Sequence, residues 1–142
     1  MLSQVKYLAR EVYSILGNSQ LEHVYRNALS FELTRVGIYH NMEVVIPINY
    51  KGHQVGYGRA DIIIGRELIL ELKAVSTKPK NTERNQILNY MRMTGITNGC
   101  IINFNKNGNY PDFLEVTLPT EPINANPNKV ITITDLKKIV EL

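Results

Sequence analysis

The chain has 142 residues, 44% of them hydrophobic, and carries a net charge of +3 with a pI near 9.0. This length and apolar content predict one globular domain over residues 1–142, and a single cysteine, Cys100, excludes an internal disulfide or a cysteine zinc cage. No signal-peptide pattern opens the sequence and no apolar run nears the roughly 20 residues that span a bilayer, so we expect an intracellular, cytoplasmic protein without membrane contact.

Two helices come first in the predicted chain order. Apolar residues recur at three- and four-residue steps from Leu2 to Leu16, which predicts an amphipathic helix that ends at Gly17. Ser19 and Glu22 have the spacing of a capping box, which would open a second helix that continues to Gly37.

A meander of three strands follows. Residues that favour strands extend from Met42 to Tyr50, and Lys51-Gly52 supplies a turn into a second run that ends at Ile64. Gly65-Arg66-Glu67 makes the next turn, before a third strand over Leu68–Ala74.

The remainder returns to helix and then strand. Helical spacing from Thr82 to Thr94 is followed by a short apolar run, Gly99–Phe104, that suits a buried strand. Phe113–Leu118 is a candidate edge strand, Pro119–Asn128 is a connection rich in proline and asparagine, and Thr134–Leu142 is a candidate terminal helix. The core order is therefore helix, three strands, helix, strand.

An acidic pair and a lysine lie on two consecutive predicted strands. If Gly65-Arg66-Glu67 is a three-residue loop, Asp61 lies opposite Glu71, and Lys73 shares their face because side chains alternate. A two-residue loop would separate the two acids unless a bulge intervened. Glu71 and Lys73 alone are also compatible with the polar face of a half-buried strand.

Two adjacent carboxylates repel each other unless a divalent cation neutralises them, and oxygen-only ligands favour Mg²⁺ or Mn²⁺. Such a metal lowers the pKa of a bound water and polarises a phosphoryl oxygen. The pattern therefore predicts phosphodiester hydrolysis, with Asp61 and Glu71 as metal ligands and Lys73 as the catalytic lysine.

Supporting residues have two interpretations each. Glu22 either supplies a third carboxylate to the metal or merely completes the capping box. Gln86 and Tyr90 stand four apart on one helix face, where they would contact substrate, although a tyrosine at this spacing is more often a core residue.

The positive charge is concentrated directly after the acidic pair. Lys78, Lys80 and Arg84 follow Lys73 within a short stretch, a placement that suits phosphates beside a metal. The alternative is a solvated, flexible loop.

Several motifs together resemble the GxxExxY proteins, a family of the PD-(D/E)XK nuclease superfamily. The resemblance spans roughly residues 16–104. Its motifs are Leu16-Gly17, Leu21-Glu22-His23-Val24-Tyr25, Tyr50-Lys51-Gly52, Arg59-Ala60-Asp61, Leu70-Glu71-Leu72-Lys73-Ala74, Gln86-Ile87-Leu88-Asn89-Tyr90 and Ile101-Ile102-Asn103-Phe104. Gln86 and Tyr90 also resemble the Gln-x-x-x-Tyr element of exonucleases related to the RecB nuclease domain.

The resemblance implies an α/β, restriction-endonuclease-like fold with an αβββαβ core and a mixed central sheet flanked by helices. The residue pattern outside the resemblance adds an extra N-terminal helix and a C-terminal extension over residues 105–142 with a strand and a helix. The resemblance also implies a divalent-metal site formed by Glu22, Asp61 and Glu71, with Lys73 as a further catalytic residue and Tyr25 as a further substrate contact.

The sequence departs from the family pattern at three positions. Ser19 replaces the glycine that gives the family its name, Ala60 replaces a proline before the aspartate, and Arg84 stands where a glutamate is frequent. The last change bears on contacts to substrate or metal.

These features predict a Mg²⁺- or Mn²⁺-dependent deoxyribonuclease whose partner is DNA, and a homodimer would supply a second active site. The alternative from another class is a non-catalytic module of the same fold that binds nucleic acid or a protein partner. A third candidate is a phosphodiesterase that acts on a small nucleotide, without the steep salt dependence of a polymer substrate.

Overall fold

The computed structural model describes residues 1–119, in three helices and five strands. The elements are α1 (Leu2–Leu16), α2 (Glu22–Arg35), β1 (Asn41–Tyr50), β2 (His53–Ile64), β3 (Leu68–Lys73), α3 (Asn81–Thr94), β4 (Asn98–Asn103) and β5 (Asp112–Thr117). The predicted connection as far as Asn128 and the predicted helix Thr134–Leu142 lie outside the described residues. Among the described helices, none has the length and apolar character needed to cross a membrane.

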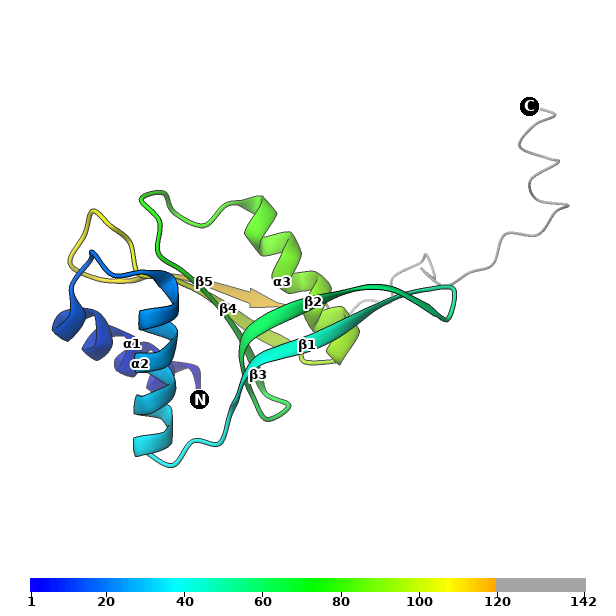
Figure 1. Ribbon diagram of the computed structural model, residues 1–142, viewed down its shortest axis with the longest axis horizontal. Helices are drawn as coiled ribbons and strands as arrows, with labels where there is room; N and C mark the ends of the chain where they lie inside the picture. Colours follow the sequence, from blue (N-terminus) through cyan, green and yellow to red (C-terminus); the bar gives the residue numbers. More distant parts are fainter. Residues whose placement is uncertain (120–142) are drawn as a thin grey trace, which may run out of the picture.

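The five strands form one mixed sheet in the order β1-β2-β3-β4-β5, in which only β3 and β4 run parallel. Helices α1 and α2 cover one face and α3 covers the other (Figure 1). The parallel pair needs a crossover connection, which α3 provides. This arrangement confirms the predicted α/β class with a mixed central sheet flanked by helices.

The turn between β2 and β3 has the predicted register. Ile64 pairs with Leu68, Ile63 with Ile69 and Ile62 with Leu70, so three residues connect the strands. Gly65 adopts a positive φ of 53°, a left-handed conformation that costs glycine little. Because side-chain direction alternates along a strand, this register decides which β2 side chains share a face with Glu71.

The face under α1 and α2 is an aromatic and aliphatic core. Tyr25 and Phe104 are fully buried and stack in parallel, with ring centroids 4.4 Å apart, and Tyr13 stacks against both rings. The Tyr25 hydroxyl donates to the Gly17 carbonyl at 2.6 Å and accepts from the Gln20 amide at 3.2 Å. One side chain therefore joins the core to the α1–α2 turn.

The predicted capping box at the start of α2 does not form. The helix begins at Glu22 with Leu21 as its N-cap, and the cap makes no side-chain hydrogen bond. Ser19 instead donates its hydroxyl to Asn18 Oδ1 at 3.1 Å. Of the two interpretations of Glu22, the structure removes the one in which its carboxylate only caps the helix.

Candidate active site

At Asp61, β2 separates from β3 and continues with β1 alone, and this point of separation is called the fork. Pairing of β2 with β3 ends at Ile62–Leu70, and the next backbone amide of β3 that faces the fork, that of Leu72, donates to Asp61 Oδ2 at 2.7 Å. On the other side, the β1 ladder omits the position opposite Asp61, where Glu43 has a left-handed φ of 51°. Asp61 is thus held at a point where β2 departs from the rest of the sheet.

Glu71 is a buried carboxyl beside Asp61. Its side chain is only 5% exposed, and burial, followed by repulsion from Asp61, raises its pKa to about 8. Hydrogen bonding from the Asp61 backbone and the positive charge of Lys73 act in the opposite direction. Glu71 Oε1 is buried without a hydrogen-bond partner among the described residues. A donor or a cation bound to this oxygen would therefore stabilise it.

Glu22 reaches the same electrostatic environment from the N-terminal end of α2. Burial and then repulsion from Asp61 raise its pKa, whereas Lys73 and Arg26 lower it. Arg26 also pairs with Glu43 at 3.1 Å, which ties α2 to the irregular position opposite Asp61. The predicted quartet of Glu22, Asp61, Glu71 and Lys73 is therefore electrostatically connected.

The donor set fits a hard divalent cation. Within residues 1–119, no group of three His, Cys, Asp or Glu side chains is arranged to hold a metal ion, so the candidate donors are the pair Asp61 and Glu71, with Glu22 as a charged neighbour. Mg²⁺ is commonly bound by one or two carboxylates, with water and substrate phosphate as its other ligands. The unpartnered oxygen of Glu71 and the raised pKa have the character expected of a site that a cation would stabilise.

Lys73 connects the acidic pair to a polar cleft along α3. The cleft has a volume of about 680 Å³ and is lined by Lys73, Thr82, Glu83, Asn85, Gln86, Asn89 and Arg92. Glu83 Oε2 accepts from the Lys80 amide at 3.0 Å, so this acid caps α3, and its pKa is lowered by those backbone hydrogen bonds. The other polar groups lining the cleft are neutral or cationic.

Gln86 and Tyr90 are hydrogen-bonded to each other but differ in exposure to solvent. Gln86 is exposed and lines the cleft, and its Nε2 donates to the Tyr90 hydroxyl at 3.1 Å. Tyr90 is only 5% exposed and packs in the core cluster under α3, against Gly58 of β2. The Gln86 side chain is thus accessible to a ligand. Tyr90 is a buried core residue whose hydroxyl accepts a hydrogen bond from Gln86.

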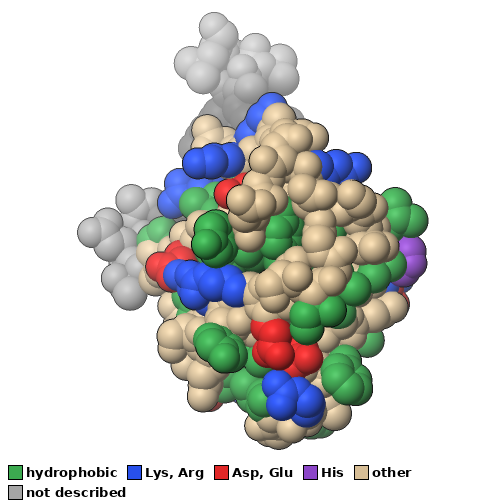
Figure 2. Space-filling view, turned by 90° about the vertical axis from the view of Figure 1, so that its left-hand side faces the viewer, with side chains coloured by type: hydrophobic (Ala, Val, Ile, Leu, Met, Phe, Trp, Pro, Cys, Tyr) green, Lys and Arg blue, Asp and Glu red, His purple; other side chains and the backbone are tan. Residues whose placement is uncertain are grey.

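The basic residues predicted to contact substrate lie around the β3–α3 loop. Lys78, Lys80 and Arg84 are all exposed, and none of them lines the α3 cleft. Figure 2 shows Lys and Arg side chains gathered at the upper end of the molecule, at the height at which Figure 1 places this loop. Tyr25, the remaining predicted contact, is fully buried in the α1–α2 core.

Asn103 is a site residue that sequence reasoning missed. It is fully buried at the end of β4, where it pairs with Lys73 across the parallel ladder. Its side-chain oxygen accepts from the Val75 amide at 3.0 Å, and its Nδ2 donates to the carbonyls of Val75 and Thr77, each at 3.1 Å. Asn103 therefore positions the loop that follows Lys73. The signals in the sequence were an asparagine at the end of an apolar run and its place in the motif Ile101-Ile102-Asn103-Phe104.

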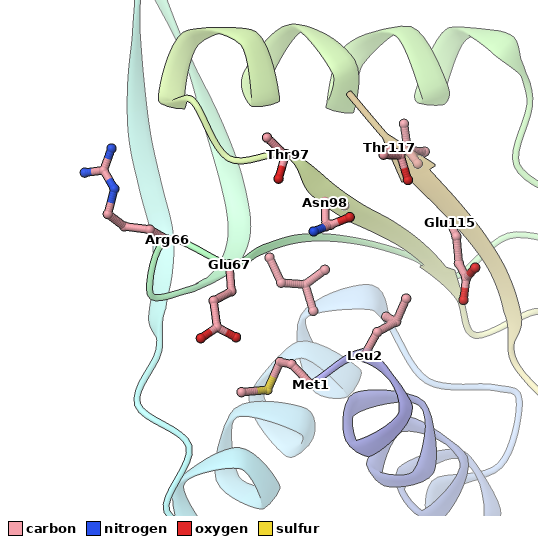
Figure 3. A pocket seen from close by; sticks show the side chains of 11 residues that line it. Met1, Leu2, Arg66, Glu67, Thr97, Asn98, Glu115 and Thr117 are labelled. Atoms are coloured by element: carbon pink, nitrogen blue, oxygen red, sulfur yellow. The ribbon is translucent and has the colours of Figure 1, made fainter. Parts of the chain in front are cut away.

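A separate cavity of about 550 Å³ lies at the opposite end of β3. Figure 3 shows Met1 and Leu2 on one side of it, and Glu67, Asn98 and Glu115 on the elements that surround it. It is lined by none of the predicted site residues, and it adjoins the β2–β3 turn rather than the fork. This cavity is therefore not part of the candidate active site around Asp61 and Glu71.

Comparisons with known proteins agree with this arrangement. The chain resembles the crystal structure of a protein designated SSO0001, with a TM-score of 0.54 and 21% identity over 70% of this chain, and it spans 50% of that protein's length. At this identity the likeness shows the fold alone. No curated protein matches the sequence at a significant level. The sequence profile of the PD-(D/E)XK nuclease superfamily matches residues 1–134, and the chain therefore belongs to this superfamily.

Proposed function

We propose that the protein is a divalent-metal-dependent nuclease that hydrolyses phosphodiester bonds in DNA. Asp61 and Glu71 would hold the metal, Glu22 would assist, and Lys73 would act on the reacting phosphate. The observation that carries the proposal is the buried Glu71 carboxyl, which lies beside Asp61 with one oxygen unpartnered in the described structure. Superfamily membership supports a nuclease in general, and the choice of DNA and of Mg²⁺ or Mn²⁺ belongs to the proposal.

Each residue has a distinct part in this mechanism. When bound, the metal would supply an activated water and polarise a phosphoryl oxygen. Asp61 is held by the Leu72 amide, so its carboxylate is already oriented before any ligand arrives. Lys73 stands between the acidic pair and the α3 cleft, where its ammonium group would offset the charge that develops on the phosphate.

The α3 cleft is the proposed place of the substrate strand. Gln86, Asn89 and Arg92 are spaced along one side of α3, three residues apart, and all line the cleft. Amide and guanidinium groups bind phosphate oxygens without reading sequence. The exposed Lys78, Lys80 and Arg84 add positive charge near its entrance at the start of α3. We therefore expect binding that depends strongly on salt and weakly on base sequence.

The test combines metal binding with cleavage. We expect Mg²⁺ or Mn²⁺ to bind the wild type in calorimetry and to support cutting of labelled DNA, and Asp61→Ala to lose both. Lys73→Ala should retain metal binding but cut about 100-fold more slowly or worse. Glu67→Ala, a change in the exposed β2–β3 turn, is the matched control.

The outcomes separate the candidate functions. Metal binding without cleavage of DNA, but with cleavage of RNA, would change the substrate and keep the mechanism. Folded wild type that binds no metal, but still binds nucleic acid, would replace the nuclease with the non-catalytic module. Turnover of a small nucleotide diester without salt dependence would favour a nucleotide phosphodiesterase.

A further inference from the structure

Strands β1 and β2 continue beyond the sheet as a two-stranded arm. Residues 45–59, here called the β-arm, pair only with each other, because the β3 partners of β2 are limited to Ile62, Ile63 and Ile64. Figure 1 shows this hairpin extending past the other strands. An isolated two-stranded hairpin is marginally stable in water, so a projection of this kind gains from a ligand that orders it.

One face of the β-arm is anchored and the other is open. Ile46 pairs with Gly58 and both face α3, where Ile46 is 2% exposed and a Cβ at Gly58 would lie 2.3 Å from the Tyr90 ring. Because side chains alternate, the pairs Val45–Arg59 and Pro47–Tyr57 point to the opposite face. Tyr57 is 68% exposed there, and Val45 and Val55 are exposed as well.

The charge of the β-arm indicates the chemistry of its partner. No aspartate or glutamate occurs between Val44 and Ala60, whereas Lys51, His53 and Arg59 do. Near the tip, the Lys51 ammonium lies 5.3 Å from the centre of the Tyr50 ring. Exposed tyrosines with nearby cations and no carboxylates suit a nucleic-acid backbone, because the cations bind phosphates and tyrosine hydroxyls donate to phosphate oxygens.

The β-arm also starts next to the candidate active site, two residues before Asp61 on β2. Tyr57 precedes Asp61 by four residues on the same strand, about 13 Å at roughly 3.3 Å per residue, which is about four base-pair steps. A two-stranded ribbon fits the major groove of a duplex, which is about 12 Å wide. The contact chain Gln86–Tyr90–Gly58 fixes the anchored face of the β-arm to α3, so the position of the arm relative to the α3 cleft is fixed as well.

We propose that the β-arm is a second nucleic-acid contact, in which Arg59 and Tyr57 hold the substrate about two and about four nucleotides, respectively, from the reacting phosphate. This inference rests on the proposed nuclease function. It predicts that the arm determines the length of nucleic acid needed for tight binding, while the acidic pair determines cleavage.

The test uses the double variant Tyr57→Ser, Arg59→Ala. In an Asp61→Asn background, which prevents cutting, we expect its affinity for a duplex of about 20 base pairs to fall about 10- to 100-fold, and the salt slope to fall by about one. The matched control is Tyr7→Ser, Arg66→Ala, since Tyr7 is 69% exposed on α1 and Arg66 is exposed in the β2–β3 turn. With Asp61 restored, hydrolysis of a small nitrophenyl nucleotide ester should be the same in the arm variant and the wild type.

Unchanged duplex affinity in the arm variant would overturn the inference. If the same variant also converted a dimer to a monomer in sedimentation, the β-arm would be a contact between protein copies.

Cleavage by the wild type with no effect of the arm variant removes the inference and leaves the nuclease. Duplex binding that depends on the arm, but without cleavage by the wild type, removes the nuclease and leaves the β-arm as the nucleic-acid contact of a non-catalytic module. A wild type that neither cuts nor binds nucleic acid overturns both.

Discussion

The two faces of β3, a strand of six residues, differ sharply in polarity. Leu70 and Leu72 point into the core under α1 and α2, and both are fully buried. Ile69 points toward α3 and is equally buried, but Glu71 and Lys73, farther along that face, meet the fork and the polar cleft. Alternation alone therefore lets one strand contribute both to a dry core and to the candidate active site.

The largest expected effect is the pH dependence that Glu71 imposes on the metal-free protein. Its folded pKa of about 8 lies above the ordinary 4.5, so the folded state holds a proton that the unfolded state releases. The contribution of Glu71 to the free energy of unfolding should therefore be fully present below about pH 4.5 and be lost, by at most about 5 kcal/mol, as the pH rises to about 8.

Denaturant unfolding in EDTA at several pH values measures this decline. Glu71→Gln should reduce it, and Glu67→Gln, in the exposed turn, should not. Added Mg²⁺ should restore stability at pH 8 to the wild type but not to Glu71→Gln. Equal pH profiles for the wild type and Glu71→Gln would show that the reactive face carries no such penalty.

On the dry face, Tyr25→Ala should lower the free energy of unfolding by about 3–5 kcal/mol, because it removes a stacked, fully buried ring. Tyr25→Phe should cost about 1–2 kcal/mol through loss of the hydrogen bonds to Gly17 and Gln20. Thermal melting measures both, with the exposed Tyr39→Ala as control. Slower DNA cleavage by Tyr25→Phe at unchanged stability would instead support the sequence prediction of a substrate contact.

Asn103→Ala should lower kcat about 10-fold while metal affinity stays close to that of the wild type. Its side chain holds the backbone of Val75 and Thr77, and outer residues of this kind act through the groups they orient. Single-turnover cleavage and calorimetry separate the two quantities. Asn98→Ala, at the exposed start of the same strand, is the control, and an equal loss in both variants would remove the positioning role.

A further prediction concerns the contact between β2 and α3. Gly58→Ala should destabilise the protein by about 1–3 kcal/mol, because the new Cβ would lie 2.3 Å from Tyr90 Cε1 and the ring would have to move. Gly56→Ala is the matched control, since no atom lies within 4 Å of its added Cβ. Equal melting temperatures for the two variants would show that the α3 face adapts more easily than the close contact indicates.

Much of the fold could be predicted because it rests on local patterns. The predicted helix Leu2–Leu16 agrees with the structure, and the predicted strands differ by a residue or two at their ends. The register of Ile62, Ile63 and Ile64 with Leu70, Ile69 and Leu68 followed from the length of one turn, but the pairing stops one position before the predicted Asp61–Glu71 pair. The expected capping box at Ser19 failed, because the chain there is held by the Tyr25 hydroxyl rather than by its own side chains.

The order of the elements and the face of β3 that carries Glu71 and Lys73 can be read from the residues alone, since periodicity and turn length are local properties. The folded chain was needed to show that Glu71 is buried beside Asp61, that Asn103 holds the loop after Lys73, and that the β-arm stands apart from the sheet. These features depend on which strands stop pairing and which helix covers them. They arise from contacts between segments distant in the chain, which no short window of residues contains.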